Sequence, residues 1–230
     1  MATKNALVVG ASRGLGLGLT TRFLERGWHV TATSRHAGDD LEALAAQWDG
    51  ALTLETVDIN DDASVTALRE RLSDNVFDLI FVNAGITHDR CETVADVSTE
   101  TFDRVMVTNA LSPMRFVERF RYLVPATGTI GVMSSGQGSI TNNTRVTGWE
   151  IYRASKSALN QLMRSFAARN SGDPRTLLLM APGWVKTDLG GSDAALTVDE
   201  STRGVADVLE AQAGAGGLQF LDYRGQTVPW

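Results

Sequence analysis

The sequence ALVVGASRGLG at residues 6–16, followed by LGLTTRFLERG at residues 17–27, decides the fold class of this 230-residue chain. The short apolar run at its start predicts a buried strand, and the glycines predict a tight turn. Leucine and phenylalanine then recur at helical spacing, and Gly27 predicts the end of that helix. A strand, a glycine turn and an amphipathic helix in this order are typical of the start of a β-α-β unit.

The same alternation continues along the whole chain. Apolar runs predict seven strands, at residues 6–10, 28–33, 52–57, 77–83, 128–134, 175–180 and 218–221. Amphipathic helical patterns between such continuous apolar strands indicate a parallel sheet covered on both faces. Right-handed crossovers then predict an α/β, doubly wound Rossmann fold, with a seven-stranded parallel sheet and helices on both faces. No repeat or linker interrupts the pattern, so we expect residues 1–230 to form a single domain.

Composition excludes several other classes of protein. The formal net charge of −6 argues against a nucleic-acid partner, and no apolar run approaches the ~20 residues of a membrane helix. Cys91 is the only cysteine, so no internal disulfide is possible and we expect a reducing, cytoplasmic location. His29, His36 and His88 lack the spacing of metal ligands, so no metal site is expected.

The glycine-rich turn at residues 10–16 predicts a nucleotide site. Glycines permit a tight turn and a close backbone approach, while the following helix offers free N–H groups to a pyrophosphate. Many ordinary turns also contain glycine. The position of this one, between the first strand and the first helix, favours phosphate binding.

The residues after the second predicted strand indicate which nucleotide binds. An NAD site commonly has an acidic residue there, whereas this chain has Ser34 and Arg35, with Arg13 in the glycine turn. An arginine fork matches a 2′-phosphate in geometry and charge. Both arginines could instead be solvated surface residues. We predict that NADP(H) is preferred, with NAD(H) possible.

Tyr152 and Lys156 form the second chemical motif. They lie four residues apart within a helical pattern at residues 150–170, so both side chains project from the same helix face. The chain has only three tyrosines. On its own the pair could still be a contact on a helix surface.

Taken together, these motifs resemble the short-chain dehydrogenase/reductase family over nearly all of the chain. They occur in the order typical of the family: residues 10–16, Asp58, residues 83–85, Asn109, Ser134 with Ser135, Tyr152 with Lys156, and Pro182 with Gly183. The segments 133–135, 152–156 and 220–230 are most similar to the C-factor-like carbonyl reductase branch.

The resemblance implies four catalytic residues. Tyr152 would exchange a proton with the substrate oxygen, Ser135 would hold that oxygen, and Asn109 would order a water. An ammonium about 5 Å from the phenol favours the phenolate by ~3 kcal/mol at an effective dielectric near 20, so Lys156 is expected to lower the pKa of Tyr152 by about two units. Lys156 would also bind the nicotinamide ribose.

The resemblance also implies a cofactor site. Residues 83–85 would close over the adenine ribose, Asp58 would lie beside the adenine, and residues 182–187 would hold the carboxamide. As ordinary features these would be a strand exit, a helix cap and a turn. The full expected set is Gly10, Ser12, Arg13, Gly14, Leu15, Gly16, Arg35, Asp58, Ile59, Asn83, Ala84, Gly85, Tyr152, Lys156, Pro182, Gly183, Val185 and Thr187.

The catalytic serine has two candidates. The family serine commonly precedes the tyrosine by about thirteen residues, which is the spacing of Ser139, whereas Ser135 precedes Tyr152 by 17. We favour Ser135 because it directly follows a predicted strand, so that residues 136–149 become an insertion facing the substrate. Trp149, Trp184, Ile86 and Val185 could line an apolar substrate pocket.

The function expected is NADPH-dependent reduction of an aldehyde or ketone to an alcohol, which is reversible, with a small-molecule carbonyl or alcohol as substrate. The alternative is an NADP-binding sensor or signalling protein with little turnover. The complete set of Asn109, Ser135, Tyr152 and Lys156 favours the enzyme, because a binding protein does not need a proton donor. Family resemblance further implies a homodimer or homotetramer.

Overall fold

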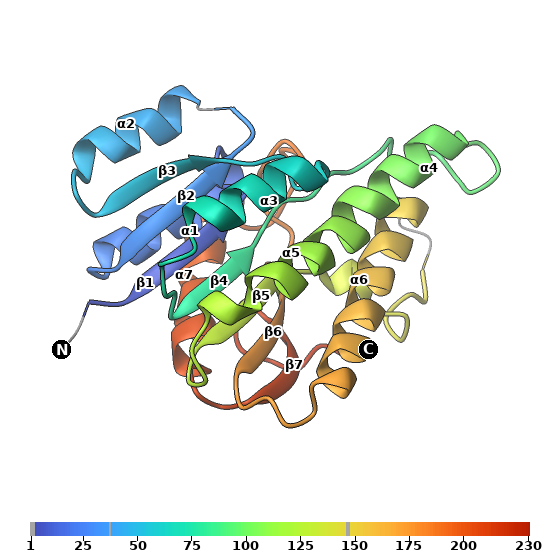
Figure 1. The fold of residues 1–230 in the computed structure, drawn as a ribbon. Coiled ribbons are helices and arrows are strands. Elements are labelled where there is room, and N and C mark those ends of the chain that lie inside the picture. The colour runs from blue at the N-terminus through green and yellow to red at the C-terminus, as the bar shows by residue number, and fades with distance from the viewer. Residues whose placement is uncertain (1–2, 37, 146–147) are drawn as a thin grey trace.

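The computed structural model describes residues 3–36, 38–145 and 148–230. Its seven-stranded sheet has the order β3-β2-β1-β4-β5-β6-β7, and all neighbouring strands are parallel (Figure 1). The strands are β1 (Asn5–Val9), β2 (His29–Ser34), β3 (Leu52–Thr56), β4 (Leu79–Val82), β5 (Thr129–Met133), β6 (Thr176–Ala181) and β7 (Gly217–Asp222). The predicted fold class is confirmed, and each strand falls on a predicted apolar run.

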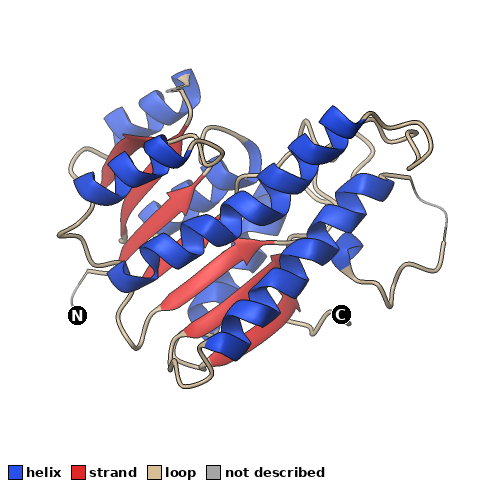
Figure 2. Cartoon of the chain, turned by 45° about the vertical axis from the view of Figure 1, so that its right-hand side comes forward, coloured by secondary structure: helices blue, strands red, loops and turns tan. Residues whose placement is uncertain are grey.

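Helices cover both faces of the sheet (Figure 2). The helices are α1 (Gly14–Glu25), α2 (Asp39–Gln47), α3 (Asp62–Arg71), α4 (Thr99–Met106), α5 (Ser112–Phe120), α6 (Glu150–Arg169) and α7 (Val198–Ala211). Apolar side chains of α1, α2 and α7 pack on one face, and those of α3, α5 and α6 pack on the other. Within the described residues, no helix is long and apolar enough to cross a membrane.

The strand sequences explain the two cores. Along β1, Leu7 and Val9 belong to one apolar cluster, whereas Ala6 and Val8 belong to the other. Successive side chains of a strand point to opposite faces, so a strand buried on both faces must be apolar throughout. This requirement produces the continuous apolar runs seen in the sequence.

The helical stretch between β4 and β5 is interrupted. Between α4 and α5 the chain forms a π-helical segment, Val107–Leu111, and after α5 it ends in a 3₁₀ turn, Arg121–Leu123. π-Helical turns are frequent at functional sites. Asn109 lies in the middle of the π-helical segment, where its side chain bonds to the backbone of another segment instead of to its own helix.

Because all strands are parallel, their carboxyl ends meet at one edge of the sheet. The chain adds β2 and β3 on one side of β1, and then β4 to β7 on its other side, so the strand order reverses between β1 and β4. A crevice opens at such a switch point, outside the carboxyl ends of the strands, and it is where ligands bind in open α/β sheets.

Candidate active site

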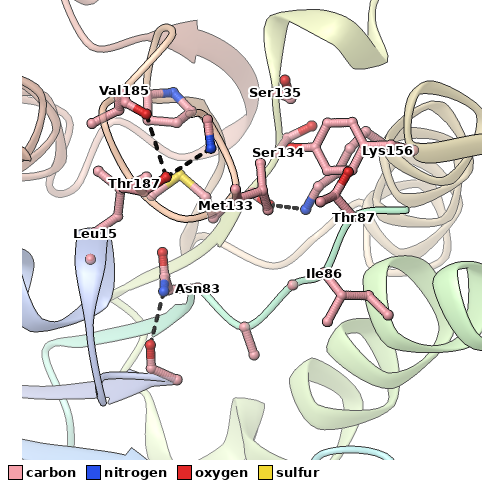
Figure 3. Close-up of a pocket in the computed structure, with 18 of the residues that line it drawn as sticks. Leu15, Asn83, Ile86, Thr87, Met133, Ser134, Ser135, Lys156, Val185 and Thr187 are labelled. Atoms are coloured by element: carbon pink, nitrogen blue, oxygen red, sulfur yellow. Dashed lines mark hydrogen bonds between the residues drawn. The ribbon is translucent and has the colours of Figure 1, made fainter. Parts of the chain in front are cut away.

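A pocket of about 1150 Å³ occupies this edge of the sheet (Figure 3). Its walls come from the segments that follow six of the strands, namely those after β1, β2, β3, β4, β5 and β6, and from the end of β7. Residues far apart in the sequence therefore meet in one cavity. Most of the predicted site residues line it, as do all four candidates for an apolar substrate wall: Ile86, Trp149, Trp184 and Val185.

The glycines of the first turn are required by close packing. Gly10 and Gly14 have φ values of +86° and +55°, which side chains rarely adopt. A Cβ on Gly10 would lie 2.9 Å from the backbone of Ala84, and one on Gly16 would lie 2.0 Å from the Gly10 carbonyl oxygen. The turn therefore brings the backbone of β1, the start of α1 and the end of β4 into contact.

The start of α1 has no capping group of its own. Arg13 precedes the helix in an extended conformation without a side-chain cap, and the first turn contains no acidic residue. By contrast, Asp61 caps α3 and Thr197 caps α7. The free N–H groups and the positive end of the helix dipole at α1 face a pocket, which is the arrangement that binds phosphate.

The segment after β2 is basic where it enters the pocket. Arg35 and Arg13 both line the pocket, and the nearest carboxylate after the strand, on Asp39, does not. Arg13 donates to Asp188 at 2.7 Å, although both side chains are 75% exposed. This contact links the glycine turn to the loop after β6 across the pocket mouth, and its exposure makes it weak.

The segment after β4 is held against the glycine turn, the π-helical segment and α6. Asn83 donates its side-chain amide to the Gly10 carbonyl oxygen at 2.9 Å. A Cβ on Gly85 would lie 3.4 Å from the Asn109 side-chain oxygen and 3.5 Å from the Lys156 Nζ atom. Asn83, Ala84 and Gly85 all line the pocket, as do Asp58 and Ile59 from the segment after β3.

Asn109 fixes the position of this segment. Its side-chain oxygen accepts from the Ile86 N–H at 2.8 Å, and its amide donates to the Ile86 carbonyl at 2.8 Å and to Ser155 at 3.0 Å. The residue is fully buried. Both amide protons are therefore used, and one lone pair of the side-chain oxygen is left. The predicted role of Asn109 in ordering a water stays a prediction.

Tyr152 and Lys156 project from α6 into the pocket, as the spacing predicts. The Lys156 Nζ atom lies 5.8 Å from the centre of the Tyr152 ring and donates to the Met133 carbonyl at 2.9 Å (Figure 3). Burial lowers the pKa of Lys156 to about 8, because the ammonium is removed from water.

The expected lowering of the Tyr152 pKa by Lys156 is wrong for the protein on its own. Burial of the phenol raises its pKa, and the hydrogen bond with the Ser135 hydroxyl opposes this only in part. The charge of Lys156 favours the phenolate, but desolvation disfavours the phenolate and the ammonium alike. The phenol is therefore protonated at neutral pH.

The two candidate serines lie in different surroundings. Ser135 lines the pocket, hydrogen-bonds to Tyr152 and accepts from the Gln137 N–H at 3.1 Å. Ser139 is buried beyond the 3₁₀ turn Gly136–Gly138, where its hydroxyl accepts from the Asn142 N–H at 3.1 Å. The structure therefore brings Ser135, and not Ser139, to the Tyr152 hydroxyl. Of the loop that follows, residues 146 and 147 lie outside the described residues.

The segment after β6 forms the opposite wall. Gly183 has a φ of +83°, and Val185 pairs with Leu196 in a short bridge. The Thr187 hydroxyl donates to the Val185 carbonyl at 3.4 Å and accepts from the Gly190 N–H at 3.1 Å (Figure 3). Pro182, Gly183, Val185 and Thr187 all line the pocket. A Cβ on Gly14 would lie 3.4 Å from the Thr187 methyl group, so this wall approaches the glycine turn.

Sequence reasoning missed several lining residues. Tyr223 and Val228 follow β7, and their place in the pocket follows from the rule that all parallel strands end at the same edge. Arg90, Gln137 and Arg153 also line the pocket, from the segments after β4 and β5 and from α6. No motif marks Arg90 or Gln137, because their position depends on the course of two loops, whereas Arg153 directly follows Tyr152 on α6.

Known proteins share both the sequence and the architecture. The short chain dehydrogenase family model matches residues 4–195. The chain is 34% identical to C-signal of Myxococcus xanthus over 158 residues, 66% of this chain and 92% of that protein. A solved Burkholderia multivorans structure with bound NADP is 52% identical with a TM-score of 0.97, and all of both chains is covered. A Pseudomonas aeruginosa PAO1 carbonyl reductase in complex with NADP is 38% identical with a TM-score of 0.92, again over all of both chains. On its sequence, its sheet order and its pocket, the chain belongs to the short-chain dehydrogenase/reductase family and has C-signal among its relatives.

Proposed function

We propose that this protein is an NADPH-dependent oxidoreductase that reduces an aldehyde or ketone to an alcohol. The observation that carries the proposal is the meeting of Ser135, Tyr152 and Lys156 in the pocket that also contains the glycine turn. A proton donor, a hydroxyl bonded to it and a buried cation form a set suited to protonating a carbonyl oxygen.

The pocket fits a dinucleotide with a 2′-phosphate. The uncapped start of α1 would bind the pyrophosphate, Arg13 and Arg35 the 2′-phosphate, and Asp58 and Ile59 the adenine. The adenine ribose would be covered by Asn83, Ala84 and Gly85. Lys156 would bind the nicotinamide ribose, and the segment 182–187 would hold the carboxamide. The two solved relatives described above contain NADP, which supports NADP(H) over NAD(H).

The bound cofactor would supply the hydride in reduction. Tyr152 donates its phenolic proton to the carbonyl oxygen, and its raised pKa keeps that proton in place at neutral pH. Ser135, which hydrogen-bonds to the phenol, is placed to hold the same oxygen. The Lys156 ammonium then stabilises the phenolate that remains, because an opposite charge in a buried site favours the ionised form. Asn109 keeps the segment at Ile86 in place around this group.

The test is oxidation of NADPH by the purified protein in the presence of aldehydes, ketones and quinones. Turnover of at least one carbonyl class, with the alcohol as product, is the expected result. Tight NADPH binding with no turnover of any of them would instead favour a sensor, an alternative that the similarity to C-signal keeps in view.

Replacement of Arg35 tests the choice of cofactor. In Arg35→Ala we expect the KM for NADPH to rise about tenfold, because a charge-assisted bond to the 2′-phosphate is lost. The KM for NADH should change by less than about twofold. Arg203→Ala, which removes an exposed arginine paired with Asp199 on α7, is the matched control. Equal changes for both cofactors would show that Arg35 does not recognise the 2′-phosphate.

Replacement of the two serines separates their roles. Ser135→Ala should lower kcat by about 10²-fold, since a donor to the developing oxyanion is lost. Ser139→Ala should leave kcat within about twofold, but lower the free energy of unfolding by about 1 kcal/mol, because the buried Asn142 bond is lost. Steady-state kinetics and urea unfolding distinguish the two. A larger loss of kcat in Ser139→Ala would reverse the assignment.

We also propose that residues 1–230 form one domain that assembles as a homodimer or homotetramer in the cytoplasm. The single sheet with cores on both faces supports the first part. The assembly is supported by three partly exposed apolar side chains: Phe102 on α4, Leu111 at the end of the π-helical segment, and Leu162 on α6. Light scattering after size-exclusion chromatography gives the oligomeric state directly.

A further inference from the structure

The pocket has more positive charge than the proposed cofactor uses. Among the described residues, seven cationic side chains and three carboxylates line it, in a chain whose net charge is −6. The proposed function assigns Arg13, Arg35 and Lys156 to the cofactor. Arg90 and Arg153 lie in a different part of the pocket, where it adjoins a second hollow.

This second hollow, the outer hollow, has a volume of about 930 Å³. It is bounded by residues 90–93, by the loop after β5 and by the start of α6. Within the part of the chain that the structure describes, its lining includes no residue of the glycine turn. Arg90, Gln137 and Arg153 line both cavities, so they form the rim through which a substrate bound near Tyr152 could extend outward.

Arg90 is held in a defined position on this rim. Its guanidinium carbon lies 4.6 Å from the centre of the Trp149 ring, and its carbonyl accepts from the Trp149 N–H at 3.0 Å. Trp149 has a φ of +56°, a conformation that is disfavoured for tryptophan, and Gly148 before it has a φ of +75°. A Cβ on Gly148 would lie 2.5 Å from the Arg90 carbonyl oxygen. The backbone therefore follows a disfavoured path that places the indole against this arginine.

The guanidinium has no acidic partner. Within the described residues no carboxylate lies within ion-pair distance of Arg90. Glu92 and Glu150 line the outer hollow, but the Glu150 carboxylate accepts from the Val94 N–H at 3.1 Å. A cation that contacts an indole ring and has no acidic partner thus lies beside the proposed catalytic pocket.

We propose that the substrate carries a carboxylate that binds Arg90. This inference rests on the proposed reductase function and adds a substrate class to it. Arginine matches a carboxylate through two parallel hydrogen bonds, and the indole keeps the guanidinium plane oriented. Arg90 is thus a specificity-determining residue, which acts on KM more than on the chemical step.

The experiment compares a homologous series of ω-oxo carboxylic acids with their methyl esters in the wild type, Arg90→Met and Arg203→Met. Methionine preserves apolar contact with Trp149 while it removes the charge. In the wild type, kcat/KM should favour the acid over the ester at the chain length that spans the site. In Arg90→Met that preference should fall about tenfold, through KM, while kcat for the esters is unchanged. Arg203→Met should behave as wild type.

Several outcomes would overturn the proposal. One is a wild type without preference for the acids, and another is an equal loss for acids and esters in Arg90→Met, as a purely structural role would give. Calorimetric titration of octanoate and octanamide into the NADP⁺-loaded protein adds a readout without turnover. If octanoate binding depends on Arg90 but neither this series nor the panel of aldehydes, ketones and quinones is reduced, the reductase function fails and the anion site stands. If octanoate does not bind better than octanamide, the anion site fails while turnover of the esters upholds the reductase.

Discussion

Tyr152→Phe is expected to lower kcat for carbonyl reduction by roughly 10³-fold, within the range that a positioned general acid contributes. The phenol is the one side chain in the pocket that hydrogen-bonds to Ser135 and also lies beside Lys156, among the residues that the structure describes. Phenylalanine keeps the ring and removes only the proton donor. The measurement is NADPH oxidation with the best carbonyl substrate of the wild type.

Binding separates this result from a loss of structure. The affinity of Tyr152→Phe for NADPH, followed by nicotinamide fluorescence, should stay within about threefold of the wild type, because the ring still fills its place. Thermal unfolding should show a folded protein. If the variant kept more than about a tenth of the wild-type kcat, Tyr152 would not be the proton donor, since an acid contributes at least about 10²-fold.

Lys156→Met is expected to abolish turnover and, at the same time, to make the protein more stable at pH 7. Burial lowers the pKa of Lys156 from 10.5 to about 8, so at neutral pH the folded state carries an ammonium that it disfavours. Its removal should raise the free energy of unfolding by roughly 2 kcal/mol, after allowance for the lost bond to Met133. Chemical denaturation without cofactor measures this gain.

The pH dependence gives the sign of the effect. Between pH 8 and pH 10.5 the unfolded chain holds a proton on Lys156 that the folded chain has lost, so wild-type stability rises with pH in this range relative to Lys156→Met. Below pH 8 both states are protonated and the full difference remains. Lys156→Arg keeps a buried charge, so its free energy of unfolding should not exceed that of the wild type at pH 7 or at pH 10.5. A constant difference between wild type and Lys156→Met from pH 7 to pH 10.5 would contradict the prediction.

Sequence patterns predicted the fold and most of the residues that line the proposed cofactor site. Strands buried on both faces must be apolar throughout, so seven continuous runs identified seven strands. Gly10 and Gly14 have positive φ values, which is a requirement of the local backbone and is therefore visible in the sequence as glycine. Tyr152 and Lys156 share a face of α6 because helical spacing alone puts them there.

Other features of the pocket were not predictable from the sequence, because they depend on contacts between distant segments and on burial. The spacing to Tyr152 left two candidates for the serine, and the 3₁₀ turn between them places Ser135 in the pocket and Ser139 outside it. Desolvation reversed the expected direction of the Tyr152 pKa, since burial cannot be read from residue spacing. Arg90 meets Trp149 through two loops that are 59 residues apart in the sequence, and no local pattern records such a meeting.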